Sequence, residues 1–171
     1  MFTRIIMPII GSIESVDVAD IKDIPAKVDT GADTSAIWAS HIDMKKDGTL
    51  SFSLFDEDSP FYTGKIYETK KYSIRRVSSS TGEEQIRYRV ELPLRLKNRN
   101  FRTNFTLSDR SKNTFPILIG RHTISKRFLV DVSKESIERP KSKHVGKLIE
   151  ELKANPYKFH HKYIKNSKEK K

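Results

Sequence analysis

The sequence predicts an all-β domain, built as a closed barrel or a sandwich with one or two short helices, followed by a basic extension. Three observations lead to this prediction. Short runs rich in β-branched and aromatic residues recur between turn residues as far as residue 132. Helical periodicity is sparse before residue 134, and the charge balance changes there. We therefore place the domain at residues 1–133 and the extension at residues 134–171.

The expected strands follow one another at short intervals, as in barrels and sandwiches. Two pairs of them form β-hairpins, one around the turn residues 78–82 and one around the turn residues 97–100. The expected strands are residues 5–13, 24–28, 72–77, 85–92, 94–96, 101–107, 115–120 and 127–132. The region that holds Gly48, Gly64 and the acidic residues 56–58 receives no assignment.

Three helices are expected. Two are short, over residues 34–40 and 121–126. The third covers residues 145–153 in the extension, where four apolar side chains recur on one helical face.

The net charge of +11 is concentrated in the extension. Residues 134–171 hold 12 Lys and Arg against 5 Asp and Glu, whereas the first 133 residues hold 21 against 17. Such a segment is usually solvated, and less often it contacts an anionic partner. We expect at most an anionic partner for it.

The composition excludes several classes of protein. The chain has no cysteine, which rules out a disulfide scaffold and thiolate metal sites. Its first residues lack the pattern of a secretory signal, and no apolar run reaches the roughly 18 residues of a membrane span. The expectation is a soluble, cytoplasmic protein without a membrane partner.

The chemistry is expected at Asp29-Thr30-Gly31, which ends a β-type run. An aspartate on such a turn can project into a cleft, while the threonine hydroxyl fixes the loop and glycine permits close backbone approach. Alone, this tripeptide more often marks an ordinary turn or a helix cap.

A second motif far along the chain changes that interpretation. Residues 26–36, Ala-Lys-Val-Asp-Thr-Gly-Ala-Asp-Thr-Ser-Ala, resemble the active-site loop of retropepsin-like aspartic proteases. Residues 115–121, Phe-Pro-Ile-Leu-Ile-Gly-Arg, resemble the second signature of that family. The resemblance covers roughly residues 2–133. It is closer still to a bacterial group labelled ATP-dependent zinc proteases, which shares the runs at residues 76–79, 107–110 and 128–131.

The resemblance implies a retropepsin-like closed barrel and hydrolysis of peptide bonds by water held between two carboxylates. Two such carboxylates share one proton, because they cannot both ionise easily at close range. The chain has a single Asp-Thr-Gly. A working pair therefore requires Asp29 from each of two chains, which makes the expected partners a second copy of the chain and a peptide or protein substrate.

The resemblance also assigns roles around Asp29, Thr30 and Gly31. Substrate contacts are expected from Ala32, Asp33, Ser79 and Gly82, the last two at the tip of a hairpin that would close over the substrate. Support of the site is expected from Ile119, Gly120 and Arg121. Asp33 and Arg121 should form an ion pair, the alternative being two unrelated surface charges.

No cofactor or metal is expected, in spite of the zinc and ATP in the group's label. The five histidines form no His-Glu-x-x-His run, and the adjacent His160 and His161 make a poor chelate. A phosphate-binding Gly-x-x-x-x-Gly-Lys-Ser/Thr loop is absent from the sequence.

Three functions remain open. The leading hypothesis is a dimeric aspartic endopeptidase. The second keeps the fold as a weakly active or inactive module for peptide binding or assembly, since a hairpin tip with one glycine departs from the glycine-rich tip of retropepsins. The third is a basic nucleic-acid-binding protein, although the region before the extension lacks an aromatic-rich basic stripe.

Overall fold

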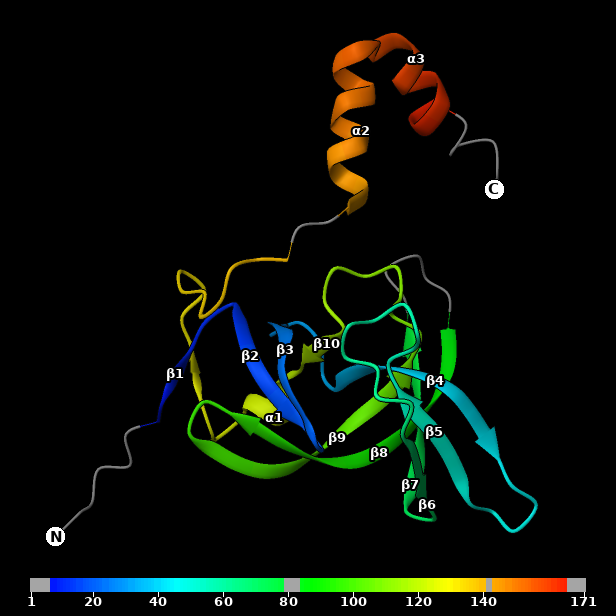
Figure 1. The fold of residues 1–171 in the computed structure, drawn as a ribbon. Coiled ribbons are helices and arrows are strands. Elements are labelled where there is room, and N and C mark those ends of the chain that lie inside the picture. Colours follow the sequence, from blue (N-terminus) through cyan, green and yellow to red (C-terminus); the bar gives the residue numbers. More distant parts are fainter. Residues whose placement is uncertain (1–6, 79–83, 141–142, 166–171) are drawn as a thin grey trace, which may run out of the picture. The chain divides into compact units, whose positions relative to one another are not determined.

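The computed structural model describes residues 7–78, 84–140 and 143–165 (Figure 1). The chain forms two compact units, Met1–Arg139 and Pro140–Lys171. The first unit is a β-barrel and the second is helical. Among the described residues, no helix is long and apolar enough to cross a lipid bilayer.

The first unit is a closed barrel of six strands, as the sequence predicts. Each strand pairs with the next, and the ring closes where β10 meets β4 in antiparallel register, Ile117 opposite Ile37. In order around the barrel, the strands are β10 (Ile117–Ile119), β3 (Ile21–Val28), β2 (Ile13–Val18), β8 (Glu84–Leu96), β9 (Arg99–Ser108) and β4 (Ser35–Met44).

The remaining strands extend this ring. β5 (Leu50–Leu54) and β6 (Ile66–Thr69) continue the sheet outward from β4, and β7 (Tyr72–Ser78) pairs with β8. β1 (Ile9–Ile10) and β11 (Leu129–Val130) form a small parallel sheet of their own.

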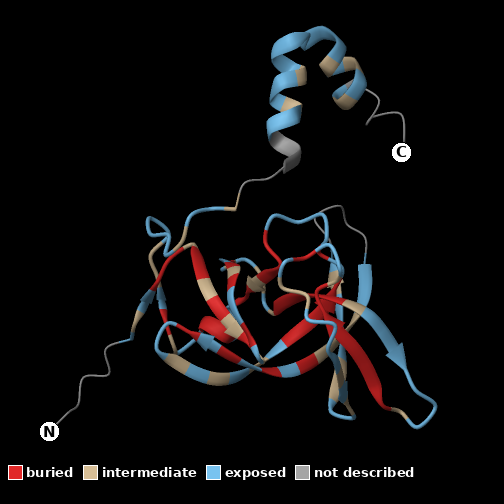
Figure 2. Cartoon of the chain, viewed as in Figure 1, coloured by how far each residue is buried: buried red, intermediate tan, exposed pale blue. Residues whose placement is uncertain are grey.

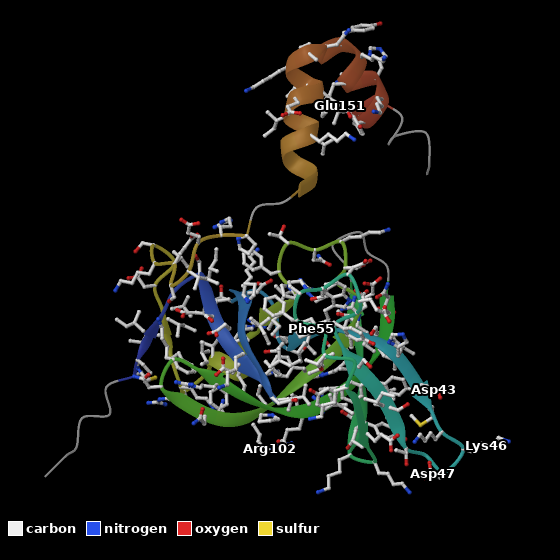
Figure 3. All side chains as sticks on the ribbon, in the orientation of Figure 1. Asp43, Lys46, Asp47, Phe55, Arg102 and Glu151 are labelled. Carbon is white, nitrogen blue, oxygen red and sulfur yellow. The ribbon has the colours of Figure 1, made fainter. Side chains whose placement is uncertain are left out.

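The barrel interior is the hydrophobic core (Figure 2). On β8, burial alternates with the period of a strand, and Val90, Leu92, Leu94 and Leu96 point inward. Phe55, drawn among the central side chains in Figure 3, is completely buried. These side chains hold the strand ends, and thus the loops that follow them, in fixed positions.

Both predicted hairpins are present, but one strand serves both. The first half of β8 pairs with β7 from Ser78 opposite Glu84 to Tyr72 opposite Val90. Its second half pairs with β9 as far as Leu96 opposite Arg99. The predicted helix over residues 121–126 is α1, Arg121–Ile124.

The predicted helix over residues 34–40 is wrong, because this segment lies in strand β4. Ala36 to Ala39 form a continuous apolar run that is buried between β9 and β10. A strand with neighbours on both sides in a closed barrel needs no polar alternation. Such a short run does not distinguish a strand from a helix by periodicity.

The predicted strand over residues 5–13 is only partly confirmed, because in its described part it divides into β1 and the start of β2. The strand conformation is interrupted at Gly11 and Ser12, and β1 and β2 on either side pair with different strands. A Cβ on Gly11 would lie 2.2 Å from the carbonyl oxygen of Lys134, which leaves room only for glycine.

The second unit is a compact group of helical segments. α2 (Lys143–Ala154) includes the predicted helix, and α3 (Pro156–His160) continues into the π-helical turn η1 (His161–Lys165). The Asn155 side chain caps α3 by accepting a hydrogen bond from the Lys158 amide at 2.9 Å. Glu151, labelled in Figure 3, accepts hydrogen bonds from Lys162 and Tyr163, both at 2.9 Å.

Residues 134–139, placed in the extension by the sequence analysis, lie in the first unit. The Lys134 carbonyl accepts a hydrogen bond from the Ser12 amide at 2.8 Å. The Ser136 amide donates to the Ile13 carbonyl at 2.9 Å. This segment therefore lies along the start of β2 and satisfies backbone groups there.

We predict that a chain ending at Arg139 keeps the thermal transition of the barrel, whereas a chain ending at Ser133 unfolds more easily. The shorter chain loses the two backbone hydrogen bonds to β2. At about 0.5–1.5 kcal/mol each, their loss lowers the free energy of unfolding by about 1–3 kcal/mol. Thermal and denaturant unfolding of both truncations measures this difference, and equal stability would contradict it.

Candidate active site

Asp29 directly follows β3, and its backbone is fixed by a neighbouring strand. β3 and β10 are parallel, with Val28 opposite Ile119. The Asp29 amide continues this ladder by donating to the Ile119 carbonyl at 2.9 Å. The position of the aspartate is thus set by the barrel and not by the loop alone.

Asp29 is half-buried, and only one of its carboxylate oxygens accepts a hydrogen bond from the described residues. Its Oδ1 accepts from the Gly31 amide at 3.0 Å. A Cβ on Gly31 would approach this oxygen to 3.3 Å, so glycine keeps the turn tight around the carboxylate. The other carboxylate oxygen has no hydrogen-bond donor among the described residues. Thr30 is exposed, and within the described part of the chain its hydroxyl forms no hydrogen bond.

The second signature holds the Asp29 loop through the backbone. The Arg121 amide donates to the Ala32 carbonyl at 2.8 Å, and the His122 amide donates to the Asp33 carbonyl at 3.1 Å. The Gly120 amide donates to the Ser35 hydroxyl at 3.0 Å. These contacts join residues some 88 positions apart in sequence.

Gly120 is packed directly against the loop. A Cβ at this position would lie 2.5 Å from the carbonyl carbon of Thr34 and 3.0 Å from the carbonyl oxygen of Ala32. Both are backbone atoms, which cannot turn aside as a flexible side chain can. Glycine is therefore required here by the close approach of two backbone segments.

Asp33 and Arg121 form the expected ion pair, through Oδ1 and Nη2. The hydrogen bond from Arg121, and then its charge, hold the pKa of Asp33 below its ordinary value. The carboxylate thus stays charged into acidic solution, and the pair is lost as the pH falls through this lowered pKa.

The ion pair is exposed, with 63% of the Asp33 side chain and 59% of the Arg121 side chain accessible. Exposed pairs contribute little to the stability of a fold, because water screens the two charges. The Asp33–Arg121 pair therefore orients the Asp29 loop and adds little to the stability of the barrel.

The arms of the β7–β8 hairpin present arginines on one face. In the β7–β8 register, Arg75 lies opposite Arg87, and Ser73 lies opposite Arg89. The Arg89 Nε donates to the Ser73 hydroxyl at 2.9 Å. Burial lowers the pKa of Arg87. The predicted tip residues, Ser79 and Gly82, lie outside the described residues.

Arg110 is a residue to which the sequence gives no role. It follows β9 within the quoted run Leu-Ser-Asp-Arg, and only 9% of it is exposed. Its Nε donates to the Phe115 carbonyl at 3.0 Å. Burial, and then the charge of Arg87, lower the pKa of Arg110 to about 10, while the charge of Asp29 acts in the opposite direction. No pattern in the sequence predicts which of the many arginines is buried.

Two surface hollows, of about 440 and 430 Å³, lie along β2, β8 and β9 around Ala19 and Arg102. Neither is lined by Asp29. Among residues 7–78, 84–140 and 143–165, no three His, Asp or Glu side chains form a group that could hold a metal ion.

Comparison with known proteins gives one family and several relatives. The model of the RimB-like family, described as "Retropepsin-like aspartic endopeptidase RimB", matches residues 9–141. Two similar curated proteins are each named "Probable alpha-L-glutamate ligase". One, from Shewanella pealeana, is 32% identical over 130 residues, covering 73% of this chain and 28% of that protein. The other, from Desulfotalea psychrophila, is 31% identical over 149 residues, covering 79% of this chain and 32% of that protein.

The chain thus spans about a third or less of the length of these curated relatives. A crystal structure of a Legionella pneumophila protein of unknown function has the same fold, with a TM-score of 0.55 and 23% identity over 75% of this chain and 95% of that one. These names include a RimB-like family and glutamate ligases, so the finer resemblance to proteins labelled ATP-dependent zinc proteases stays a prediction.

We predict that Gly120→Ala destabilises the barrel. The added methyl group forces apart the backbones of the Asp29 loop and the start of α1, at a cost of about 1–3 kcal/mol, as overpacking usually has. Denaturant unfolding should show a lower midpoint with an unchanged slope. Gly146→Ala is the matched control, because no atom lies within 4 Å of its Cβ. Unchanged stability of Gly120→Ala would show that the two segments separate easily.

Proposed function

The chain belongs to the RimB-like family of retropepsin-like aspartic endopeptidases, and we propose that it hydrolyses peptide bonds as a homodimer with Asp29 from each subunit. One observation carries the proposal. Asp29 is half-buried, and its carboxylate accepts one hydrogen bond from the described residues, donated by the Gly31 amide, so that its second oxygen has no donor among them.

The mechanism follows from the chemistry of paired carboxylates. When two Asp29 side chains meet, one is charged and takes a proton from water, while the other is protonated and donates to the peptide. Gly31 holds the turn through the hydrogen bond from its amide to Asp29, whereas Thr30 is exposed. Ala32 and Asp33 follow the turn, where a bound peptide backbone would run. Ile119, Gly120 and Arg121 support this loop through the backbone contacts described above.

We propose that the substrate is an acidic peptide. The curated relatives are named as ligases of glutamate, an acidic amino acid. Positive charge also gathers around the site. Arg75 influences the Asp33 carboxylate, and Arg87 and Asp29 both influence Arg110. A peptide rich in carboxylates would be attracted to such a surface.

A second candidate is a non-catalytic module that binds peptide or assists a ligase. It is favoured by the names of the relatives and by the small part of their length that the chain matches. The intact Asp-Thr-Gly favours the endopeptidase instead. The hydrolysis experiment below decides between the two.

For the second unit we propose an anionic partner. Its described lysines outnumber its described glutamates, Glu150 and Glu151, and Glu151 is already engaged by Lys162 and Tyr163. Nucleic-acid binding by the barrel itself has less support, because its large aromatic side chains, such as Phe52 and Phe105, are buried in the core.

We predict that Asp29→Asn lowers hydrolysis of acidic and unstructured substrates by about a hundredfold or more, because the amide cannot take up or release the shared proton. The variant should keep the thermal stability and the oligomeric state of the natural chain. Equal activity of the two proteins would exclude the mechanism.

Mixing the two proteins tests whether the site is shared between subunits. In an equimolar mixture with random pairing, only about a quarter of the dimers carry two aspartates. The activity per natural chain should therefore fall by about half as the subunits exchange. Unchanged activity would show that one chain holds a complete site.

A further inference from the structure

Helix α1 holds the Asp29 loop, yet it is too short to fix its own position. It has four residues, Arg121–Ile124, and no side chain caps its N-terminus, which lies at Gly120. A single helical turn has little stability in water, because one hydrogen bond does not offset the entropy lost in ordering it. The contacts that place α1 must therefore come from the rest of the barrel.

Three hydroxyl groups join α1 to two strands of the barrel. The Gly120 amide donates to the Ser35 hydroxyl at 3.0 Å. The hydroxyl oxygens of Ser35 and Thr123 lie 2.8 Å apart, and those of Thr123 and Thr103 also lie 2.8 Å apart. Ser35 begins β4, Thr123 belongs to α1 and Thr103 belongs to β9. The three hydroxyls therefore link the helix to neighbouring strands of the wall.

Burial fixes the direction of these hydrogen bonds. Ser35 and Thr123 are each only 1% exposed, so bulk water does not supply them with partners. An amide can only donate, so the Ser35 oxygen accepts from Gly120 and its own proton points to Thr123. The Thr123 proton then points to Thr103, which is half-buried. Each of the two buried hydroxyls thus accepts one hydrogen bond and donates one, as buried polar groups in native proteins nearly always do.

The hydroxyls that hold the loop differ from the one that the sequence predicts. The sequence favours the hydroxyl of Thr30, but Thr30 is exposed and its hydroxyl forms no hydrogen bond within the described residues. Ser35 lies at the end of the loop, where β4 begins. Its backbone is held as well, because the Thr106 hydroxyl donates to its carbonyl at 3.2 Å. Within one subunit, the loop is therefore fixed through Ser35.

The position of α1 reaches Asp29 through the backbone. The amides of Arg121 and His122 donate to the carbonyls of the two loop residues that follow Gly31. The Gly31 amide in turn donates to the Asp29 carboxylate. A shift of α1 would therefore move the carboxylate's donor, although the Asp29 amide would stay on the β3–β10 ladder. Such shifts matter for catalysis, because a displacement of about 1 Å can lower a rate about a hundredfold.

We propose that Ser35 and Thr123 are positioning residues, which hold α1 and thereby set the orientation of the Asp29 carboxylate. The proposal rests on the proposed function, since it assumes that Asp29 performs the hydrolysis. Neither hydroxyl touches the substrate or takes part in proton transfer. Loss of either should lower kcat and leave KM nearly unchanged, because the substrate still binds while the carboxylate is misplaced.

Thr123→Val removes the central hydroxyl and keeps the branched shape of the side chain. The Ser35 proton is then left without its acceptor inside the barrel. In the full chain, assayed below its thermal transition, we expect kcat for an unstructured protein substrate to fall about tenfold, with KM within about twofold of the natural value. Thr123→Ser keeps the hydroxyl and should restore most of the lost rate. A loss of rate that Thr123→Ser does not restore would contradict the role of the hydroxyl.

Amide hydrogen exchange, followed by NMR, tests the same proposal without any activity. In Thr123→Val, the amides of Arg121 and His122 should exchange about tenfold faster, because the loop separates from α1 more often. The Asp29 amide is the internal control, since it belongs to the β3–β10 ladder and should stay protected. Equal acceleration of all three amides would show a general loss of stability and would overturn the proposal.

Thr49→Val is the matched control. It makes the same substitution in another buried threonine, whose hydroxyl donates one hydrogen bond, to Asp47 at 2.9 Å. Asp47 is labelled in Figure 3 on the β4–β5 hairpin, which Figure 1 shows far from α1. This variant should leave kcat and the exchange of the Arg121 amide unchanged. A fall in kcat as large as that of Thr123→Val would show that lost stability alone lowers the rate, and would overturn the proposal.

A double substitution tests whether the two residues act together. Ser35→Ala removes the partner of both Gly120 and Thr123. If the hydroxyls act as one unit, then Ser35→Ala combined with Thr123→Val should lower kcat no further than Ser35→Ala alone. Losses that multiply would show independent effects and would exclude the joint role.

The outcomes also separate this proposal from the proposed function. If the natural chain hydrolyses no peptide, then the endopeptidase is excluded, and hydrogen exchange still decides whether the hydroxyls position the loop. If the natural chain and Thr123→Val hydrolyse with the same kcat and exchange their amides at the same rates, then the endopeptidase stands and the positioning role is overturned.

Discussion

The parallel pairing of β3 with β10 is the interaction on which the rest of the structure depends. It closes the barrel on one side of β10, while the antiparallel pairing with β4 closes it on the other. The same ladder ends in the hydrogen bond from the Asp29 amide to Ile119. The strand that completes the fold is therefore also the strand that places the candidate catalytic residue.

Much of this arrangement could be predicted from the sequence, because two separated motifs pointed to one topology. The Asp29 loop, the Gly120-Arg121 turn and both hairpins follow from local patterns whose order along the chain is informative. The ion pair of Asp33 with Arg121 could be predicted for the same reason. Its exposure could not, since burial depends on what else packs nearby.

The predictions that were wrong or missing also depend on tertiary packing, which local sequence patterns do not reveal. The run Ala36–Ala39 is equally apolar as a helix or as a strand, and only its two neighbouring strands decide between them. Strand β6 is half-exposed and lacks a strong β-type pattern, so the sheet beyond β4 was not anticipated. Arg110 is chemically an ordinary arginine, and only the folded loop makes it a buried one.

The effect of an arginine on the fold therefore depends on whether its side chain is exposed or buried. Arg95, Arg102 and Arg121 are exposed and pair with carboxylates in water, where each pair contributes little to the stability of the fold. Arg110 is largely buried, so water screens its charge less than it screens the charges of these exposed arginines.

The shared strand β8 has a mechanical consequence. From Arg89 onward it is hydrogen-bonded to β9 in the barrel wall, whereas from Glu84 to Tyr88 it is held by β7. A swinging movement of the hairpin must therefore bend β8 at the junction between Tyr88 and Arg89, where one flank of the strand loses its support. The barrel wall holds β8 from Arg89 onward, so amide hydrogen exchange should be faster over Glu84–Tyr88 than over the residues that follow.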